Sequence, residues 1–334
     1  MKRHGPILLS VVFLSIAAPA ASQAQSAAEI AKRGWQAFTE GHPAEAQPLL
    51  AEAVRRDPKR PSYHIALAEV DWRLGDAKGA IHQWETALRL NPADEEVRSK
   101  LAQVYQALGR DLDVVRVLEA PNPRDANLAR VWRFSRGFSL FRLGRLAAAQ
   151  REFQPLVSHP DFQAPANFFL GRIAYTQNHF EEALPFFADA VRLGDSPTNK
   201  EYSSYTYDYG LTLFKLGRFA EANAQFTLST ERYAREPLAW MMRGRCEEEL
   251  RNYQGAIAAY EESIKVDPKF ELSYYHLARL QQRYGDKQRA EELFKRLGEL
   301  RQGELSDAQM RAEDAAALRM KAGSSPGPAS VPAP

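Results

Sequence analysis

The chain has 334 residues, of which 45% are hydrophobic and 26% are charged, and its formal net charge is +2. These fractions are typical of a soluble folded protein. The single cysteine, Cys246, excludes any disulfide bond within the chain. Its position two residues after Gly244, within a helical pattern, predicts a packed small side chain rather than a reactive thiol.

The first 25 residues have the pattern of a secretory signal peptide. Residues 2–4 are basic, residues 7–16 form a short apolar run, and residues 19–24 supply the small side chains that a signal peptidase requires. We therefore predict that residues 1–25 are a cleaved signal peptide and that the protein is periplasmic or secreted. The alternative is an uncleaved anchor, although the apolar run is short for a membrane-spanning helix. We expect no integral membrane span in the mature chain.

Cleavage changes the charge balance of the protein. Removing Lys2 and Arg3 leaves 42 of the 44 basic residues, against 42 acidic residues, so the mature chain is formally neutral. The basic character of the precursor therefore gives no support for nucleic acid or an anionic membrane as a partner. We expect no nucleic-acid ligand.

The stretch from Pro61 to Asp94 predicts one helix, a tight turn and a second helix. Gly75 suits the left-handed conformation that ends a helix, and Asp76 suits the cap of the next helix. Proline at position 92 then ends the second helix, because proline disfavours helical geometry in the residue before it. One apolar face of this second helix is formed by Ala80, Ile81, Trp84, Ala87 and Leu88.

Four positions of this unit recur along the chain, with a step of 34 residues at five of the seven joins. The first small position holds Gly34, Ala68, Ala102, Gly137, Gly171, Gly210, Gly244 and Ala278. The turn position, seven residues later, holds Gly41, Gly75, Gly109, Gly144, Asn178, Gly217, Arg251 and Gly285. The second small position holds Ala46, Ala80, Val114, Ala149, Ala183, Ala222, Ala256 and Ala290. The large position holds Leu50, Trp84, Leu118, Phe153, Phe187, Phe226, Tyr260 and Phe294.

This period and the order of glycine, alanine, phenylalanine and proline resemble the tetratricopeptide repeat. The resemblance covers eight copies over residues 27–297. It implies an all-α fold, in which helix-turn-helix repeats stack into a right-handed superhelical solenoid. Other repeats built from helical pairs are the alternative, but their periods are usually longer.

Several copies depart from the pattern. Proline fills the closing position only at Pro58, Pro92 and Pro268, and Arg251 is unusual at the turn position. The third copy ends early at residues 121–123, which predicts a short second helix. Five extra residues fall between the fifth and sixth copies, within residues 194–200.

The repeat pattern weakens after the eighth copy. We expect its last helix to continue to about Leu300 and residues 298–322 to form a C-terminal capping region. Residues 306–309 have the form of a capping box, and a solenoid needs a polar cover over its last apolar face. The alternative is a frayed, partly helical tail. Residues 323–334 are rich in Gly, Ser, Ala and Pro and predict a disordered tail.

No arrangement of residues indicates catalysis. The sequence lacks a phosphate-binding loop, a nucleophile elbow and the zinc motif of metalloproteases. Its seven histidines are scattered, and its acidic runs are those of solvated helix faces. We therefore predict that the protein is not an enzyme and uses neither a cofactor nor a metal.

In arrays that resemble this one, the first helix of each repeat lines a concave wall. The wall positions, counted from the first small position, carry aromatic residues in copies four to six and basic residues among and after them. The predicted groove residues are Phe134, Phe138, Phe141, Arg142, Phe168, Arg172, Tyr175, Tyr207, Leu211, Phe214, Arg245, Arg279 and Arg283.

Some of these aromatic residues have a second interpretation. The position four residues after the first small position also holds Phe38 and Trp72, so aromatic residues there, such as Tyr175, can pack between helices. No such role accounts for another set, which we expect to be exposed and to mark a binding surface. This set is Phe134, Phe138, Phe168 and Tyr207.

We predict an exported scaffold that holds a protein or an extended peptide in its concave groove. The expected ligand carries large apolar side chains together with acidic residues or a free carboxylate, which the arginines orient. The alternative function is an envelope-assembly or chaperone-like adaptor for unfolded or nascent envelope proteins. An enzyme is a third class that no residue pattern supports.

Overall fold

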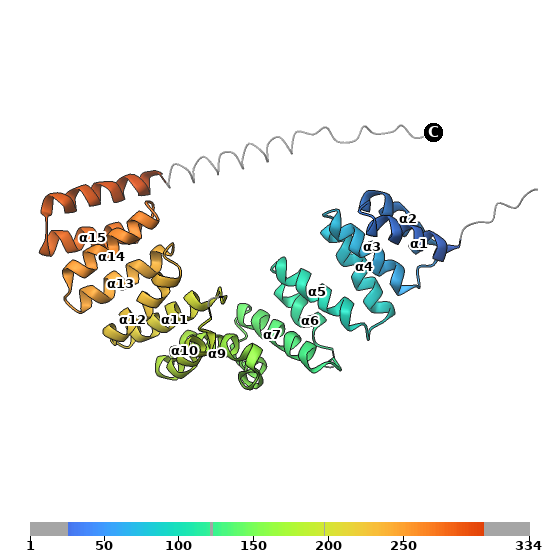
Figure 1. Ribbon diagram of the computed structural model, residues 1–334, viewed down its shortest axis with the longest axis horizontal. Coiled ribbons are helices and arrows are strands. Elements are labelled where there is room, and N and C mark those ends of the chain that lie inside the picture. Colours follow the sequence, from blue (N-terminus) through green and yellow to red (C-terminus); the bar gives the residue numbers. More distant parts are fainter. Residues whose placement is uncertain (1–25, 121–122, 197, 304–334) are drawn as a thin grey trace, which may run out of the picture. The chain divides into compact units, whose positions relative to one another are not determined.

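The computed structural model describes residues 26–120, 123–196 and 198–303, and the part of the chain that it describes contains helices and no strands (Figure 1). The described residues form two compact units, with the boundary between Arg110 and Asp111. The first unit contains α1 (Ala27–Thr39), α2 (Pro43–Arg56), α3 (Pro61–Arg73), α4 (Ala77–Leu90) and α5 (Glu95–Ala107).

The second unit contains helices in the same alternating order. They are α6 (Asp111–Val117), α7 (Ala126–Arg142), α8 (Leu146–Phe153), the 3-10 helix η1 (Gln154–Ser158), α9 (Pro160–Thr176), α10 (Phe180–Gly194), α11 (Tyr202–Lys215), α12 (Phe219–Arg232), α13 (Pro237–Glu249), α14 (Tyr253–Val266) and α15 (Glu271–Tyr284). Residues 287–303 are also helical. Consecutive helices pack in pairs, including α1 with α2, α3 with α4, α9 with α10, α11 with α12 and α13 with α14. The all-α prediction is confirmed.

Small and large side chains explain the pairing. A methyl group added at Gly171 would lie 2.9 Å from the ring of Phe187, and one added at Gly244 would lie 2.5 Å from Tyr260. The first small position therefore admits the large side chain of the partner helix, sixteen residues later in the sequence. Ala80 and Ala183, at the second small position, are fully buried, as expected for close helix crossings.

The turn position has the conformation that its residue types predict. Its glycines at five copies have positive φ, as do Asn178 (64°) and the unusual Arg251 (59°). Gly285 differs, with a φ of −139°. At this turn the backbone N–H of Asp286 donates to the side-chain oxygen of Gln281, at 2.9 Å, where other turns use a backbone carbonyl five residues back. The Gln281 side chain thus replaces the backbone carbonyl that accepts this hydrogen bond at turns whose residue has positive φ.

The departures from the repeat have local structural consequences. Helix α6 is only 7 residues long, which confirms the short second helix of the third copy. In the insertion, the Asn199 side-chain amide donates to the Gly194 carbonyl at 2.7 Å, and the Asn199 side-chain oxygen accepts from the backbone of Glu201 at 3.0 Å. Asn199 therefore holds the segment that leads into α11.

Cys246 is fully buried, and burial raises the pKa of its thiol to about 12. This confirms the prediction of a packed, unreactive side chain.

Three predicted segments fall largely outside the described residues. The signal peptide, residues 1–25, and the disordered tail, residues 323–334, lie there entirely, as does most of the capping region, residues 298–322. Residues 298–303 continue the helix that begins at residue 287. No helix among the described residues combines the length and apolar character needed to cross a membrane.

Candidate binding site

The aromatic side chains of α7 and α9 form one cluster centred on Phe169. The ring centroid of Phe169 lies 5.4 Å from those of Phe138 and Phe168 and 5.8 Å from that of Phe134, and it stacks on Phe153 at 5.0 Å. Edge contacts and offset stacking of this kind stabilise a packed interior. The cluster is therefore part of the core of the second unit as well as a wall of its surface.

This packing corrects the expectation that four of the aromatic residues are exposed. Phe168 retains only 6% of its accessible surface, because it packs against Phe169, Phe187 and Tyr205. The other three, Phe134, Phe138 and Tyr207, are half-buried. These three rings are partly accessible to solvent.

The packing interpretation holds for the aromatic residues four positions after the first small position. Tyr175 lies 5.2 Å from Phe180, and Phe214 lies 5.2 Å from Phe219, so each ring contacts the second helix of its own pair. Phe141 packs on Phe169 at 5.5 Å. Leu211 packs at the edge of the core formed by α11 to α15.

Most of the predicted arginines already have partners within the chain. Arg142 lies 3.3 Å from the buried carboxylate of Asp111. Three others cover aromatic rings, at 4.6 to 5.5 Å from the ring centroids: Arg245 over Phe214, Arg279 over Tyr275 and Arg283 over Tyr284. These cation–π contacts hold the arginines along the helix surface and leave less of their charge available to a ligand.

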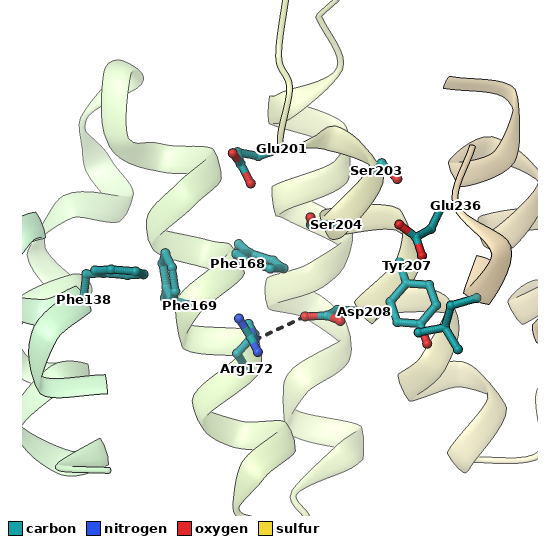
Figure 2. A pocket seen from close by; sticks show the side chains of 11 residues that line it. Phe138, Phe168, Phe169, Arg172, Glu201, Ser203, Ser204, Tyr207, Asp208 and Glu236 are labelled. Atoms are coloured by element: carbon teal, nitrogen blue, oxygen red, sulfur yellow. Dashed lines mark ion pairs between the residues drawn. The ribbon is translucent and has the colours of Figure 1, made fainter. Parts of the chain in front are cut away.

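A cavity of about 440 Å³ opens between α7, α9, α11 and α13 (Figure 2). Its apolar wall consists of Phe138, Phe168, Phe169 and Leu238. Its polar wall consists of Arg172, Glu201, Ser203, Ser204, Tyr207, Asp208 and Glu236. Cavities of this size and mixed lining are typical of sites for small ligands or side chains.

An ion pair crosses the floor of this cavity, from Arg172 on α9 to Asp208 on α11 (Figure 2). The guanidinium Nε lies 3.3 Å from the Asp208 Oδ2, and the guanidinium also lies over the rings of Phe141 and Phe168. Burial raises the pKa of Asp208 to about 6, against the opposing effect of Arg172. A single guanidinium therefore does not compensate the loss of solvent around this carboxylate.

The amino-acid sequence matches the model of the family described as the tetratricopeptide repeat, over residues 31–95, 65–112, 135–198 and 207–271. These ranges take in more than half of the chain. The chain belongs to the tetratricopeptide repeat family. Among curated proteins no match is found.

Solved structures are also similar, two of them described as tetratricopeptide repeat proteins. The MamA RS-1 ArsTM double mutant is 18% identical, with a TM-score of 0.48 over 53% of this chain and 97% of its own. A tetratricopeptide repeat protein from Parabacteroides merdae is 15% identical, with a TM-score of 0.47 over 77% of this chain and 99% of its own. YrrB, described as having an unusual peptide-binding site, is 17% identical, with a TM-score of 0.34 over 68% of this chain and 96% of its own. The family assignment depends on the sequence match.

Four of the predicted groove residues line the cavity between the tetratricopeptide repeats: Phe138, Phe168, Arg172 and Tyr207. The sequence prediction missed its acidic side. Asp208 lies two residues before the first small position, a position that holds Lys32, Phe169 and His276 in other copies and so has no constant chemistry. Glu201, Ser203 and Ser204 directly follow the insertion, and the extra residues are the signal that could have directed attention to them.

The first unit has a second cavity of about 440 Å³, between α1 and α3. It is lined by Ala28, Ala31, Lys32, Trp35, Ser62, Tyr63, Ile65 and Ala66. Trp35 is 44% exposed, and its ring contacts Phe38 at 5.2 Å. This cavity has no carboxylate in its wall.

Proposed function

We propose that the protein is an exported scaffold that binds an extended segment of a partner protein in the cavity between α7, α9, α11 and α13. The observation that carries this proposal is the cavity itself, which combines aromatic walls with an ion pair whose carboxylate is partly buried. An aromatic wall supplies binding energy through burial of apolar surface, and the polar groups fix the orientation of the ligand.

Membership of the tetratricopeptide repeat family supports binding in general terms, because such proteins bind proteins or peptides. The family is generally not enzymatic, which agrees with a scaffold. The choice of this cavity over the other surfaces is our own inference. The cavity lies where the repeat step lengthens to 39 residues, between Gly171 and Gly210, so it is specific to this chain rather than common to its repeats.

A display library of random peptides, panned against the mature chain, tests the proposal. Selected peptides are then titrated against Ser204→Trp, which fills the cavity from an exposed position on α11. The matched control is Ser62→Trp, an exposed serine on α3 in the wall of the other cavity. We expect Ser204→Trp to weaken binding at least tenfold and Ser62→Trp to leave it unchanged.

Failure of every selected peptide to respond to Ser204→Trp would place the binding surface elsewhere. Equal binding of any unfolded chain, without sequence preference, would favour the chaperone-like adaptor instead. Both outcomes are separate from a failure of the variant to fold, which circular dichroism detects.

Export is a second part of the proposal, and it depends on the basic, apolar and small-residue segments of residues 1–25. Expressed with its own leader in a Gram-negative host, the protein should appear in the periplasmic fraction with a mature N-terminus near Gln23 or Gln25. High salt should release it from membranes without detergent. A protein that retains Met1 and requires detergent would instead be anchored.

A further inference from the structure

We propose that the bound segment presents a lysine or arginine side chain to this cavity, with its charge against Asp208 and its methylene groups along the aromatic wall. The inference depends on the proposed function, since it names the chemistry of the segment that the cavity takes. The charge of this ligand is opposite to that of the acidic ligand that the arginines in the sequence led us to expect.

The charge lining the cavity favours a cation. Three carboxylates, Asp208, Glu201 and Glu236, face it together with one guanidinium, that of Arg172 (Figure 2). Arg172 is paired with Asp208, whereas neither glutamate forms an ion pair within the described part of the chain. An acidic ligand would meet two unpaired carboxylates and a guanidinium already engaged, while a basic ligand would meet complementary charge.

The surroundings of Asp208 add a second reason. Arg172 and Tyr175 face its carboxylate from α9, Tyr207 precedes it on α11, and Glu236 lies at the start of α13. Among these neighbours Arg172 carries the positive charge that acts on Asp208, and the charge of Arg245 on α13 acts on Tyr207. Burial raises the pKa of Asp208 in spite of that pair, so a second cation brought by a ligand would stabilise the ionised form.

The apolar wall suits the stem of such a side chain. Lysine and arginine place several methylene groups between the backbone and the charge, and these groups pack on apolar surface while the charged end reaches a polar site. Phe138 and Leu238 contribute to the apolar wall, and Glu201 and Asp208 belong to its polar side. A side chain that extends from one wall to the other matches this division.

The site also belongs to one join of the repeat array. Glu201 and Ser204 directly follow the five extra residues, and Asn199 holds the backbone that places Glu201. At the other joins of 34 or 35 residues the chain has no such segment before the next first helix. A ligand preference for a basic residue is therefore expected from this cavity and not from the repeat fold in general.

The test uses the peptides selected by panning, each synthesised with every basic residue replaced in turn by norleucine, which keeps the stem and removes the charge. We expect one such replacement to weaken binding to the mature chain about tenfold. The same peptide replacement should have little effect on binding to Asp208→Asn, because this variant lacks the carboxylate that pairs with the charge of the peptide. Asp189→Asn, at a half-exposed aspartate on α10 that pairs with Arg192, should retain the full loss.

Selected peptides that are acidic or neutral, or an equal loss in Asp208→Asn and the wild type, would overturn the inference while leaving the proposed function intact. If no peptide binds the wild type in a manner sensitive to Ser204→Trp, the proposed function fails as well. Competition by free spermidine as strong as competition by the peptide would show that the site takes a polyamine rather than a protein segment, and would also overturn the proposal.

Discussion

The two cavities of about 440 Å³ have the same volume and different chemistry. The cavity of the first unit is lined mainly by alanine, isoleucine and aromatic side chains, with Lys32 as its one charged residue. The cavity of the second unit has three carboxylates and a guanidinium. Both lie against first helices of the repeat. The repeat therefore provides the spaces between helices, while residues outside its small, turn and large positions determine what those spaces can bind.

Substitutions at the buried helix crossings, which both units contain, should have the largest effect on stability. Ala80→Arg and Ala183→Arg each place a charge at a fully buried helix crossing and should destabilise their own repeats by several kcal/mol. Thermal unfolding followed by circular dichroism should lose cooperativity in both variants. Ala147→Arg, at an exposed position of α8, is the matched control and should unfold like the wild type. Wild-type behaviour of Ala183→Arg would contradict the close packing of α9 with α10.

These small positions are also the part of the structure that the sequence predicts well. Each residue at the first small position must admit a large side chain sixteen residues later, so steric exclusion limits that position to glycine or alanine and the pattern becomes visible. Positive φ restricts the turn position in the same way, and Asn178 follows the rule. Arg251 adopts the same conformation despite its side chain, which shows that the packed pair of α13 and α14 imposes the turn.

The proposed binding site is less predictable, because the burial of its side chains depends on several helices at once. The spacing of Phe168 places it on the wall face, but neighbouring rings from α9, α10 and α11 bury it. Asp208 occupies a position whose residue type varies between repeats. The pKa of its carboxyl group depends on burial by several helices, which no local sequence pattern indicates. The sequence pattern did not indicate that the arginines have partners within the chain, because these aromatic and acidic residues lie on other turns and helices.

A second prediction concerns the stability of the carboxylate site. The pKa of Asp208 is about 6 in the folded chain and near 3.8 when it is unperturbed, so the native state binds the extra proton between these values. The contribution of this carboxyl group to the free energy of unfolding is therefore fully present below about pH 4. It is lost as the group ionises and the pH rises through about 6. Asp208→Asn should therefore be more stable than the wild type at neutral pH, by at most about 2 to 3 kcal/mol.

Chemical unfolding of both proteins across this pH range measures the effect. The gain of Asp208→Asn should shrink towards pH 4, and Asp189→Asn, whose carboxylate is half exposed, should show little gain at any pH. A loss of stability in Asp208→Asn at neutral pH would mean that the pair with Arg172 outweighs the desolvation of the carboxylate. The cavity would then be a structural ion pair that gains nothing from a second cation.

The smallest expected effect comes from the cavity of the first unit. Trp35 is 44% exposed and its nearest ring partner is Phe38, so Trp35→Ala should cost less than a core truncation, on the order of 1 kcal/mol. For peptides whose binding is weakened by Ser204→Trp, the affinity for Trp35→Ala should lie within twofold of that for the wild type. The reason is that the cavity between α1 and α3 offers no carboxylate to a basic ligand. Fluorescence titration of the same peptides against both variants measures this. A loss in Trp35→Ala as large as that in Ser204→Trp would mean that apolar contact with the first unit, rather than charge in the second, dominates the affinity.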